Sequence, residues 1–407
     1  MLGLGAFIAP ASCRLLTCAC QLGAISVATA FSASRFFNNL LIFNNRDYSD
    51  SLPAGTNRIS RRHPGKTPRK HPLFPPRFLE PPPGVKLTCE DALGSISCAM
   101  GESGELLRKG PVHILVNPLA GGGSGGRSVP RIRAFLAGQG IAAQFHTTQT
   151  APEMERIAAE AIGRGARVLL AMGGDGTLQT LVNAVFLSDV VLGILPAGGG
   201  NDFAAALGLP GDALAAAGTI LSGSIRSVDL ALARTADGRE RFYCGGGGVG
   251  LDAVAARYAA EVYGRVPGRM RYVLAALSAL RNYSAVTVRA EFPGSELEPV
   301  EKRVLVAAAL NTPTYGAGLR LAPLAKIDDG LLDIVFVEDL RAYEVVPVVF
   351  HWALRGELRT RKMARFAAPR VRITTDQRCM FHGDGEILGP APVEIEVVAR
   401  AVRMLAA

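Results

Sequence analysis

Three glycine-rich loops, each placed directly after a short apolar segment, constrain the fold of this chain more than any other feature. Apolar runs of this length are typical of strands buried on both faces of a parallel sheet. A repeated order of strand, glycine loop and helix predicts an open α/β sheet, which binds ligands at the carboxyl ends of its strands. The apolar segments are 113–117, 167–172 and 190–195, and the loops are Asn117-Pro-Leu-Ala-Gly-Gly-Gly-Ser-Gly-Gly-Arg127, Gly173-Gly-Asp-Gly-Thr177 and Pro196-Ala-Gly-Gly-Gly-Asn-Asp202.

Loops of this kind are suited to phosphate groups. Glycine lets backbone amides approach phosphate oxygens, and the helix that follows adds the positive end of its dipole. In the second loop, Asp175 could place a carboxylate near phosphate-bound Mg²⁺, and Thr177 could donate a hydrogen bond to a phosphate oxygen. The alternative for the same residues is a tight turn with a capping threonine.

The first loop fits two well-known patterns only in part. Gly121, Gly123 and Gly126 match the dinucleotide pattern GxGxxG, but the second strand ends in threonines and not in the acidic residue that would bind a ribose. The loop also approaches a Walker A motif, with Arg127 in place of the required lysine. A segment this rich in glycine matches several such patterns by chance, so neither literal reading is favoured.

Residues after about 225 follow a different pattern, in which short β-branched segments alternate between apolar and polar positions. This predicts a mainly antiparallel β-sandwich domain behind the open α/β domain. We expect an extension of low order over 1–109, a nucleotide-binding α/β domain over 110–228 and a β-rich substrate domain over 229–407. The expected strands are 227–233, 241–244, 285–292, 303–310, 331–337, 371–375 and 393–398, and the expected helices lie near 251–262, 267–281 and 341–354.

The first 99 residues differ from the rest of the chain. They carry most of the formal net charge of +9, and 44–86 has neither helical nor strand periodicity, which indicates disorder. The apolar stretch 2–31 is too interrupted for a membrane helix and lacks the basic start of a secretory signal. Met100 is the next methionine after Met1, which suggests that translation starts there. Because only Cys244 and Cys379 follow it, no disulfide framework is expected and a reducing cytoplasm is the default.

Six motifs in order identify a family resemblance. The NPxxG of the first loop, the GGDGT of the second and the GND of the third are followed by Gly248-Val-Gly-Leu-Asp252 and Ala322-Pro-Leu-Ala-Lys-Ile-Asp-Asp-Gly-Leu-Leu-Asp333, and then by Gly383-Asp-Gly-Glu386. This series resembles the diacylglycerol kinase catalytic family, which groups bacterial lipid kinases with sphingosine and ceramide kinases. The resemblance covers essentially the whole chain after residue 110.

The resemblance implies an ATP-dependent lipid kinase that transfers the γ-phosphoryl group to the hydroxyl of diacylglycerol or a related lipid, with Mg²⁺. The base would be Glu386 or Asp384, a choice that the sequence leaves open, and Asp175 is a further candidate that would act through Mg²⁺. The metal would be bound by the Asp329 carboxylate and the carbonyls of Lys326 and Leu331, which are hard oxygen ligands. A hairpin turn is the alternative for this Asp-Gly pair. The implied nucleotide-binding residues are Asn117, Pro118, Leu119, Ala120, Gly121, Thr148, Gly173, Gly174, Asp175, Gly176, Thr177, Leu178, Gln179, Gly199, Asn201 and Asp202.

Two positions depart from the family pattern. Gly199 stands where the third loop usually has a threonine, so one phosphate-contacting hydroxyl is missing. Gln179 stands where asparagine is common. These departures leave open a kinase of a soluble substrate, similar to NAD kinase, or a non-catalytic member that binds nucleotide or lipid.

The partners implied are a lipid substrate and an anionic membrane surface, which the protein would touch peripherally from the cytoplasm. Basic residues of 257–271 and 355–372 could rest on anionic headgroups, although a solvated basic face explains them equally well. A homodimer is compatible with the sequence. Nucleic acid is not an expected partner, because few aromatic residues are interleaved with the basic ones and no recognition motif is present.

Overall fold

The first half of the described chain builds a parallel sheet, as the glycine-loop pattern predicts. The computed structural model describes residues 101–407 apart from 265, 267–269, 317, 341–343, 345–347, 349–350, 352–355, 357 and 359, all within one compact unit, Leu87–Ala407. The sheet has the order β2-β1-β3-β4, and every pairing in it is parallel. Its strands are β1 (Val112–Val116), β2 (Ala143–Thr147), β3 (Val168–Gly173) and β4 (Val191–Pro196).

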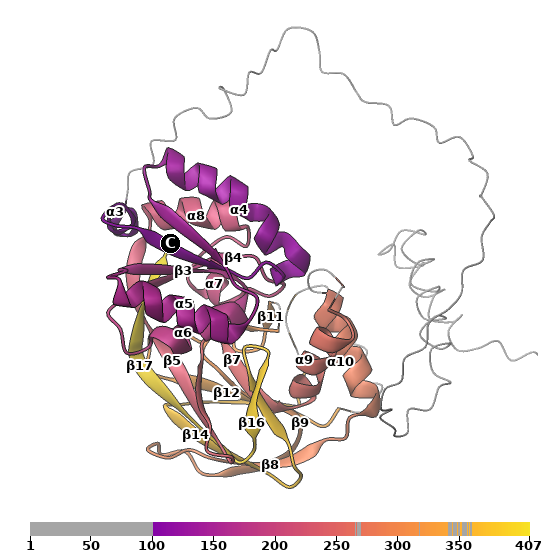
Figure 1. Ribbon diagram of the computed structural model, residues 1–407. Coiled ribbons are helices and arrows are strands. Elements are labelled where there is room, and N and C mark those ends of the chain that lie inside the picture. The colour runs from indigo at the N-terminus through magenta and orange to yellow at the C-terminus, as the bar shows by residue number, and fades with distance from the viewer. Residues whose placement is uncertain are drawn as a thin grey trace, which may run out of the picture. The chain divides into compact units, whose positions relative to one another are not determined.

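Helices cover both faces of this parallel sheet (Figure 1). One face carries α4 (Ala120–Gly138), α8 (Ala213–Ser222) and α3 (Glu102–Arg108), and the other carries α5 (Ala151–Gly163) and α6 (Asp175–Val185); the short α7 (Asp202–Ala206) follows the third loop. Every residue of β1, β3 and β4 is buried. Burying one Val, Leu or Ile side chain contributes about 1.5–3 kcal/mol, so these apolar strands give the first half its core.

Two helices of this half were not expected from the sequence. Helix α8 is rich in alanine and has no strong polar face, and it is capped by Asp212, whose carboxylate accepts from the backbone N–H groups of Leu214 and Ala215. Helix α3 lies inside the range expected to be of low order. The remainder of that range and the suggested start at Met100 lie outside the described residues.

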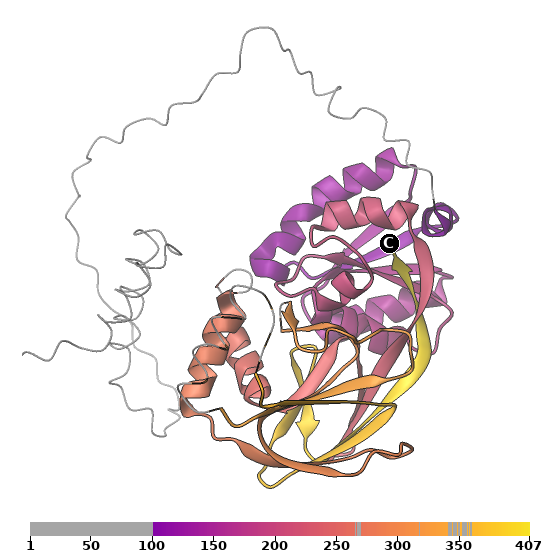
Figure 2. The ribbon, with the colours of Figure 1, turned by 180° about the vertical axis from the view of Figure 1, so that it is seen from behind.

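The second half is built from antiparallel strands, as expected for a β-sandwich (Figure 2). Helices α9 (Leu251–Glu261) and α10 (Met270–Asn282) lie beside these strands in both views. Six strands were not expected, namely β7, β10, β11, β13, β15 and β16, whose bounds follow, and most of the helix expected near 341–354 lies outside the described residues. The strands are β6 (Glu240–Tyr243), β7 (Gly246–Gly250), β8 (Val286–Glu291), β9 (Val300–Leu310), β12 (Leu332–Glu338), β13 (Met363–Ala368), β14 (Arg370–Thr375), β15 (Met380–Gly383) and β16 (Glu386–Pro390), with the two-stranded pair β10 (Thr314–Tyr315) and β11 (Leu319–Arg320).

Two long strands, β5 (Ser224–Thr235) and β17 (Val393–Ala406), run through both halves. They pair with each other antiparallel along their length, with a register shift between Val398 and Val402. Beyond this shift, β17 joins the parallel sheet, where Arg403 pairs with Val191 of β4. The boundary expected between 228 and 229 therefore falls inside a continuous strand.

A buried carboxylate holds the bend of this strand pair. Asp229 is 1% exposed, and it accepts from the backbone N–H of Arg400, which has φ +51°, and from that of Gly330, both at 2.7 Å. The backbone N–H of Asp229 donates to the Ile327 carbonyl. A buried carboxylate is tolerated only when its oxygens are hydrogen-bonded, so Asp229 ties β5, β17 and the turn at 328–330 together.

Among the residues that the structure describes, no helix combines the length and the apolar character needed to span a bilayer.

Candidate functional site

The carboxyl ends of the parallel strands open into a cavity of about 460 Å³. Its walls come from all three glycine loops, from the start of α5, from α9 and α10, and from the turn between β15 and β16. We call it the glycine cavity. It is lined by Asn117, Leu119, Ala120, Gly121, Thr148, Gln149, Thr150, Ala151, Met154, Gly174, Asp175, Gly176, Thr177, Thr180, Gly198, Gly199, Gly200, Ala256, Ala259, Arg271, Asp384, Gly385 and Glu386.

The first loop needs glycine for two physical reasons. Gly121, Gly122 and Gly123 have φ of +57°, +67° and +90°, a left-handed backbone that other L-residues adopt only with strain. A Cβ on Gly121 would also lie 2.1 Å from the Ala197 carbonyl oxygen, so the first loop packs backbone against the third. Asn117 joins the first loop to the second, because its Nδ2 donates to Thr177 Oγ1 at 3.3 Å.

The second and third loops also touch through their backbones. A Cβ on Gly198 would lie 2.6 Å from the Gly174 Cα, a distance that only glycine permits. Asn201, with φ +60°, closes the third loop on itself, since its Oδ1 accepts from Gly198 N–H and its Nδ2 donates to the Gly198 carbonyl. A cradle of backbone this close to the surface of the cavity is suited to anionic oxygens.

Asp175 carries out a task that its motif did not suggest. Its two oxygens accept from the backbone N–H groups of Asp202 and Phe203, each at 3.1 Å, which fixes the start of α7. Burial, together with the charges of Asp202 and Asp384, raises the pKa of Asp175 to about 7, against the lowering effect of the two N–H donors. The carboxylate lines the glycine cavity while it holds the second and third loops together.

Asp384 is held even more firmly, at the turn between β15 and β16. Its carboxylate accepts from the N–H groups of Cys244 at 2.6 Å, Gly245 at 2.9 Å and Gly246 at 3.2 Å. Burial raises the pKa of Asp384 to about 6, and these three donors work against the rise. The residue has φ +48°, so the turn and the carboxylate position are fixed together.

Glu386, two residues further on, is in a different state. It is exposed, and a Cβ on Gly176 would lie 3.8 Å from its Oε1, which places the carboxylate over the first turn of α6. Although the residue as a whole is exposed, partial desolvation of its carboxyl raises the pKa of Glu386, Arg241 lowers it and Glu155 raises it. Of the two acids in this turn, Glu386 is therefore the one whose carboxylate lies over the second loop.

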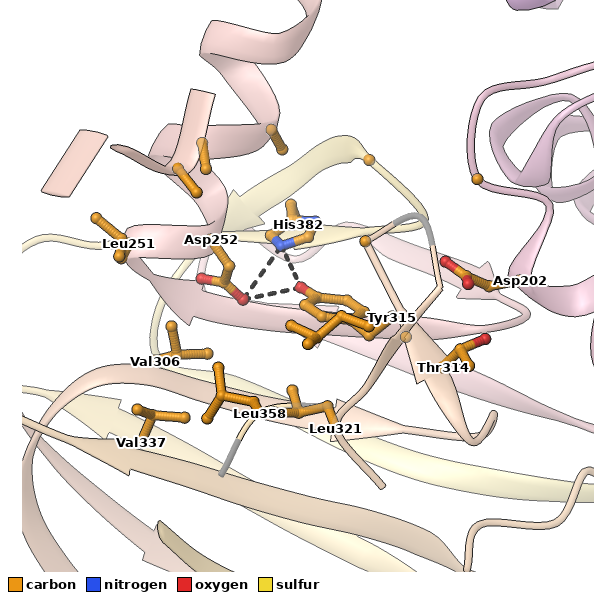
Figure 3. A pocket seen from close by; sticks show the side chains of 18 of the residues that line it. Asp202, Leu251, Asp252, Val306, Thr314, Tyr315, Leu321, Val337, Leu358 and His382 are labelled. Atoms are coloured by element: carbon orange, nitrogen blue, oxygen red, sulfur yellow. Dashed lines mark hydrogen bonds and ion pairs between the residues drawn. The ribbon is translucent and has the colours of Figure 1, made fainter. Parts of the chain in front are cut away.

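A second cavity, of about 240 Å³, adjoins the glycine cavity and is mainly apolar (Figure 3). We call it the apolar cavity. The two cavities share Asp175, Gly200, Ala256, Asp384 and Gly385 among their lining residues. The apolar side chains that line it are Leu251, Ala255, Ala256, Ala276, Leu277, Leu305, Val306, Leu319, Leu321, Val337, Leu340, Val348 and Leu358.

A polar cluster of Asp252, Tyr315 and His382 lies in the apolar cavity. Figure 3 shows these three side chains turned toward one another. The Tyr315 hydroxyl lies 2.8 Å from Asp252 Oδ2 and 2.6 Å from His382 Nε2, and this nitrogen lies 3.2 Å from Asp252 Oδ2. Burial raises the pKa of Tyr315 well above its ordinary value, and the Asp252 charge adds to the rise, so the phenol keeps its proton.

The turn at 328–330 lies outside both sets of lining residues. Asp329 Oδ1 accepts from the Leu331 N–H at 3.1 Å, and Asp328 pairs with Arg226 at 2.6 Å. Burial and the Asp329 charge raise the pKa of Asp333. The Asp329 carboxylate and backbone carbonyls are oxygen donors that suit Mg²⁺, so the expected metal ligands are chemically suitable, at a turn that lines neither cavity.

Ten of the sixteen expected nucleotide-binding residues line the glycine cavity, and six do not. Leu178 and Gln179 are fully buried, and Gln179 Nε2 donates to the Phe242 carbonyl, while Asp202 lines the apolar cavity. The expected residues that line the glycine cavity are Asn117, Leu119, Ala120, Gly121, Thr148, Gly174, Asp175, Gly176, Thr177 and Gly199. Those that do not line it are Pro118, Gly173, Leu178, Gln179, Asn201 and Asp202.

Sequence reasoning missed the start of α5 and the contribution of α9 and α10. Thr150 caps α5 by accepting a hydrogen bond from the Glu153 N–H. A threonine followed by a proline in the first turn is a sequence signal for a helix start, and it could have pointed to this part of the site. Ala256, Ala259 and Arg271 carried no such signal, because nothing local indicates that their helices fold over the glycine loops.

Comparison with known proteins agrees with this architecture. The chain matches the diacylglycerol kinase catalytic domain over residues 111–233 and the YegS C-terminal NAD kinase beta sandwich-like domain over residues 247–406. It is 29% identical to a diacylglycerol kinase of Mycobacterium tuberculosis (strain H37Rv), covering 74% of this chain and 98% of that protein. It is 30% identical to a protein of Stenotrophomonas maltophilia named "Probable lipid kinase YegS-like", covering 66% of this chain and 87% of the relative.

Solved structures show the same fold. The crystal structure of a diacylglycerol kinase from Bacillus anthracis str. Sterne superposes with a TM-score of 0.55 at 20% identity, covering 73% of this chain and 97% of that one. With its two matched domains, its six ordered motifs and this shared fold, the chain belongs to the diacylglycerol kinase catalytic-domain family.

Proposed function

We propose that this protein transfers the γ-phosphoryl group of ATP to the hydroxyl of diacylglycerol or a related lipid. The observation that carries the proposal is the junction of the two cavities at Asp175, Asp384 and Gly385. One cavity is walled by glycine backbone and suits phosphates, and the other is walled by apolar side chains and suits an acyl chain. A phosphoryl donor and a lipid acceptor would meet at this junction.

The nucleotide would occupy the glycine cavity. The left-handed glycines of the first loop and the start of α6 would direct backbone N–H groups at its phosphates, and Thr177 would add a hydroxyl donor. Magnesium, when bound with the nucleotide, would neutralise phosphate charge. An ion at the 328–330 turn would instead be held by Asp329 and the carbonyls of Lys326 and Leu331, and it would stabilise the bend of β5 and β17.

We assign the base to Glu386. The carboxylates of Asp175 and Asp384 already accept two and three backbone N–H groups, whereas Glu386 is exposed beside the second loop. Glu386 would take the proton from the acceptor hydroxyl as the new O–P bond forms and the bond to ADP breaks. Asp384 would position this turn, and Asp175 would position the second and third loops.

The acceptor would enter through the apolar cavity. Its acyl chain would contact Leu277, Val306 and Leu321, while the cluster of Asp252, Tyr315 and His382 would offer hydrogen bonds to its polar part. Because such a lipid resides in a bilayer, we further propose a cytoplasmic protein that touches an anionic membrane peripherally. A homodimer is also compatible with this function.

The test is phosphoryl transfer by the full chain with Mg²⁺-ATP and lipids in mixed micelles. Diacylglycerol, monoacylglycerol, sphingosine, ceramide and phosphatidylglycerol would be compared, with NAD as a soluble acceptor. We expect transfer to one lipid class. Replacing Glu386 by Gln should lower kcat by about 10²–10⁴ with little change in the KM for ATP.

The Asp384→Asn variant separates the two acids of the turn. Asparagine can accept fewer of the three N–H groups, so we expect lower thermal stability as well as lower activity. Transfer to NAD, or no transfer to any acceptor in spite of ATP binding, would exclude the lipid kinase.

A further inference from the structure

Glu386, to which the proposed function assigns the proton transfer, lies among charged groups of both signs. Its Oε1 lies over the first turn of α6, 3.8 Å from the Cβ that a side chain at Gly176 would carry. Anionic neighbours disfavour the ionised form of a carboxyl, and cationic neighbours favour it. The charged residues that line the glycine cavity here or act on Glu386 are Asp175 of α6, Asp384 of the same turn, Arg271 of α10, Arg241 of β6 and Glu155 of α5.

Strand β6 holds the backbone next to Arg241 against the helix that follows the second loop. The Phe242 N–H donates to Asn183 Oδ1 at 2.9 Å. The Phe242 carbonyl accepts from Asn183 Nδ2 at 2.9 Å and from Gln179 Nε2 at 3.1 Å. Because Asn183 and Gln179 both belong to α6, these hydrogen bonds fix where Arg241 lies along that helix.

The same strand packs against the turn that carries Glu386. A Cβ on Gly383 would lie 2.9 Å from the Tyr243 Cβ, so the hairpin of β15 and β16 rests directly on this tyrosine. Gly383 pairs with Glu386 across the turn. Since side chains alternate along a strand, Arg241 and Tyr243 point to the same face of β6. The Arg241 side chain therefore leaves β6 on the face that the hairpin of Glu386 covers.

An ion pair with α5 holds the guanidinium in place. Both terminal nitrogens of Arg241 lie 3.4 Å from Glu155 Oε1, and the two side chains are 35% and 36% exposed. The pair uses two of the five N–H groups of the arginine, so the guanidinium keeps donors and charge for a second partner. Burial raises the pKa of Glu386, Arg241 lowers it and Glu155 raises it, as expected if the guanidinium lies between the two carboxylates.

We propose that Arg241 is a positioning residue of the reaction, which holds the Glu386 carboxylate over the second loop in its ionised form, and that Glu155 sets the strength of this effect. The inference rests on the proposed function, with Glu386 as the base. A base must be ionised to accept the proton of the acceptor hydroxyl, and a partly desolvated carboxyl beside two other carboxylates tends to keep its own proton. Arg241 stays charged throughout the physiological range, and Glu155 offsets part of its charge.

The experiment compares Arg241→Ala, Arg241→Lys and Glu155→Gln with the unmodified full chain. NMR titration of protein labelled with ¹³C at the glutamate carboxyl carbons would follow Glu386 without lipid or nucleotide, and Glu386→Gln would identify its signal. We expect the pKa of Glu386 to rise in Arg241→Ala and to fall in Glu155→Gln, because one variant removes the cation and the other removes the anion that offsets it. Lysine should keep most of the unmodified value, since it keeps the charge without the fork.

The pH dependence of kcat with the accepted lipid provides the second arm. The acidic limb of this profile reports the base in the complex, so it should move to higher pH in Arg241→Ala and to lower pH in Glu155→Gln. We expect kcat of Arg241→Ala on the acidic limb to be about threefold lower than that of the unmodified protein, with a smaller loss at alkaline pH.

The matched controls are Arg156→Ala and Glu160→Gln, which break an exposed ion pair of the same helix α5 that lines neither cavity. Both controls should leave the titration of Glu386 and the pH profile unchanged. Melting temperatures of all variants would identify loss of fold. If Arg241→Ala does not fold, Arg241→Lys and Glu155→Gln decide.

An unchanged titration of Glu386 in Arg241→Ala and Glu155→Gln, or shifts of the same sign in both, would overturn the proposal for Arg241. Equal shifts in the two controls would overturn it as well. If the unmodified protein phosphorylates no lipid, the proposed function fails by itself. The titration then still decides whether Arg241 keeps Glu386 ionised.

Discussion

The two cavities that meet at Asp384 are built in opposite ways. The glycine cavity is made of backbone, and its shape depends on the absence of side chains at positions such as Gly121, Gly174 and Gly198. The apolar cavity is made of side chains from seven or more separate segments, with one polar cluster inside it. The first can therefore be damaged by adding a single methyl group, whereas the second can be reshaped by degrees. Four changes would break or sharpen this comparison.

The largest effect is expected at Gly121. In Gly121→Ala the new Cβ would meet the Ala197 carbonyl oxygen, and a displaced loop should lower kcat/KM for ATP on the order of 100-fold. Gly122→Ala is the matched control, because its φ of +67° carries the same strain of about 1–2 kcal/mol but its Cβ would meet nothing within 4 Å. Steady-state kinetics and melting temperatures would be measured together. Equal losses in both variants would mean that strain, not loop contact, matters.

A graded effect is expected in the apolar cavity. Ala276→Phe would fill part of it and raise the KM for a long-chain lipid about tenfold, with the KM for ATP unchanged. A short-chain acceptor should lose much less, because it needs less of the space. Ala159→Phe, at an exposed position of α5, is the control for helix and solubility effects. A rise in KM that ignored chain length would show that the acyl chain lies elsewhere.

A pH effect is expected at the junction of the two cavities. Because burial raises the pKa of Asp175 from 3.8 in the unfolded chain to about 7, the folded state prefers the protonated form. The contribution of the protonated Asp175 carboxyl to the free energy of unfolding is fully present below pH 4 and is lost as the pH rises through about 7. In Asp175→Asn, the free energy of unfolding should therefore fall less between pH 5 and pH 8, as measured by urea titration.

The control for this titration is Asp212→Asn, an exposed carboxylate that also accepts two backbone N–H groups, at the start of α8. The histidine pair His113 and His146 acts in the opposite sense, since burial lowers the pKa of both and their contribution is lost as the pH falls below about 6.5. Comparing variants at both pH values cancels this background. An unchanged pH slope in Asp175→Asn would contradict the buried, protonated carboxyl.

The smallest effect is expected at the turn that lines neither cavity. Arg226→Ala breaks an exposed ion pair with Asp328 and should cost less than about 1 kcal/mol. Asp329→Asn should lower the melting temperature by a few degrees and leave both KM values unchanged. A chelator should lower the melting temperature of the unmodified protein and not that of Asp329→Asn. A tenfold change in the KM for ATP would place this turn in the chemistry after all.

The unequal construction of the cavities also explains what could be predicted from the sequence. The strand, loop and helix order around the glycine loops is local, so the parallel sheet was predicted correctly and the glycine loops were expected at its ligand-binding edge. The apolar cavity depends on which strands and helices meet, and residues such as Leu321 and Val337 read as ordinary core. Arg271 was one basic residue among several, because only the packing of α9 and α10 brings it to the glycine cavity.

Motif residues were harder to interpret than motif positions. Asp175 and Asp202 were expected at the phosphates; Asp175 lines the glycine cavity and also caps α7, whereas Asp202 lines only the apolar cavity. Asp229 belongs to no motif that the sequence suggested, although it holds the bend of β5 and β17. Hydrogen bonds between residues far apart in the chain decide these roles, and a one-dimensional pattern does not contain them.

The end of β17 has a consequence for how the molecule is made. Arg403 and Met404 pair with β4, and Leu405 and Ala406 are fully buried in the core of the first half. On the ribosome, the edge of β4 stays open until this strand, the last one described, has been synthesised and has left the exit tunnel. We expect the early part of the chain to wait in an incomplete state with an exposed strand edge, where a chaperone could bind and where stalled products would aggregate.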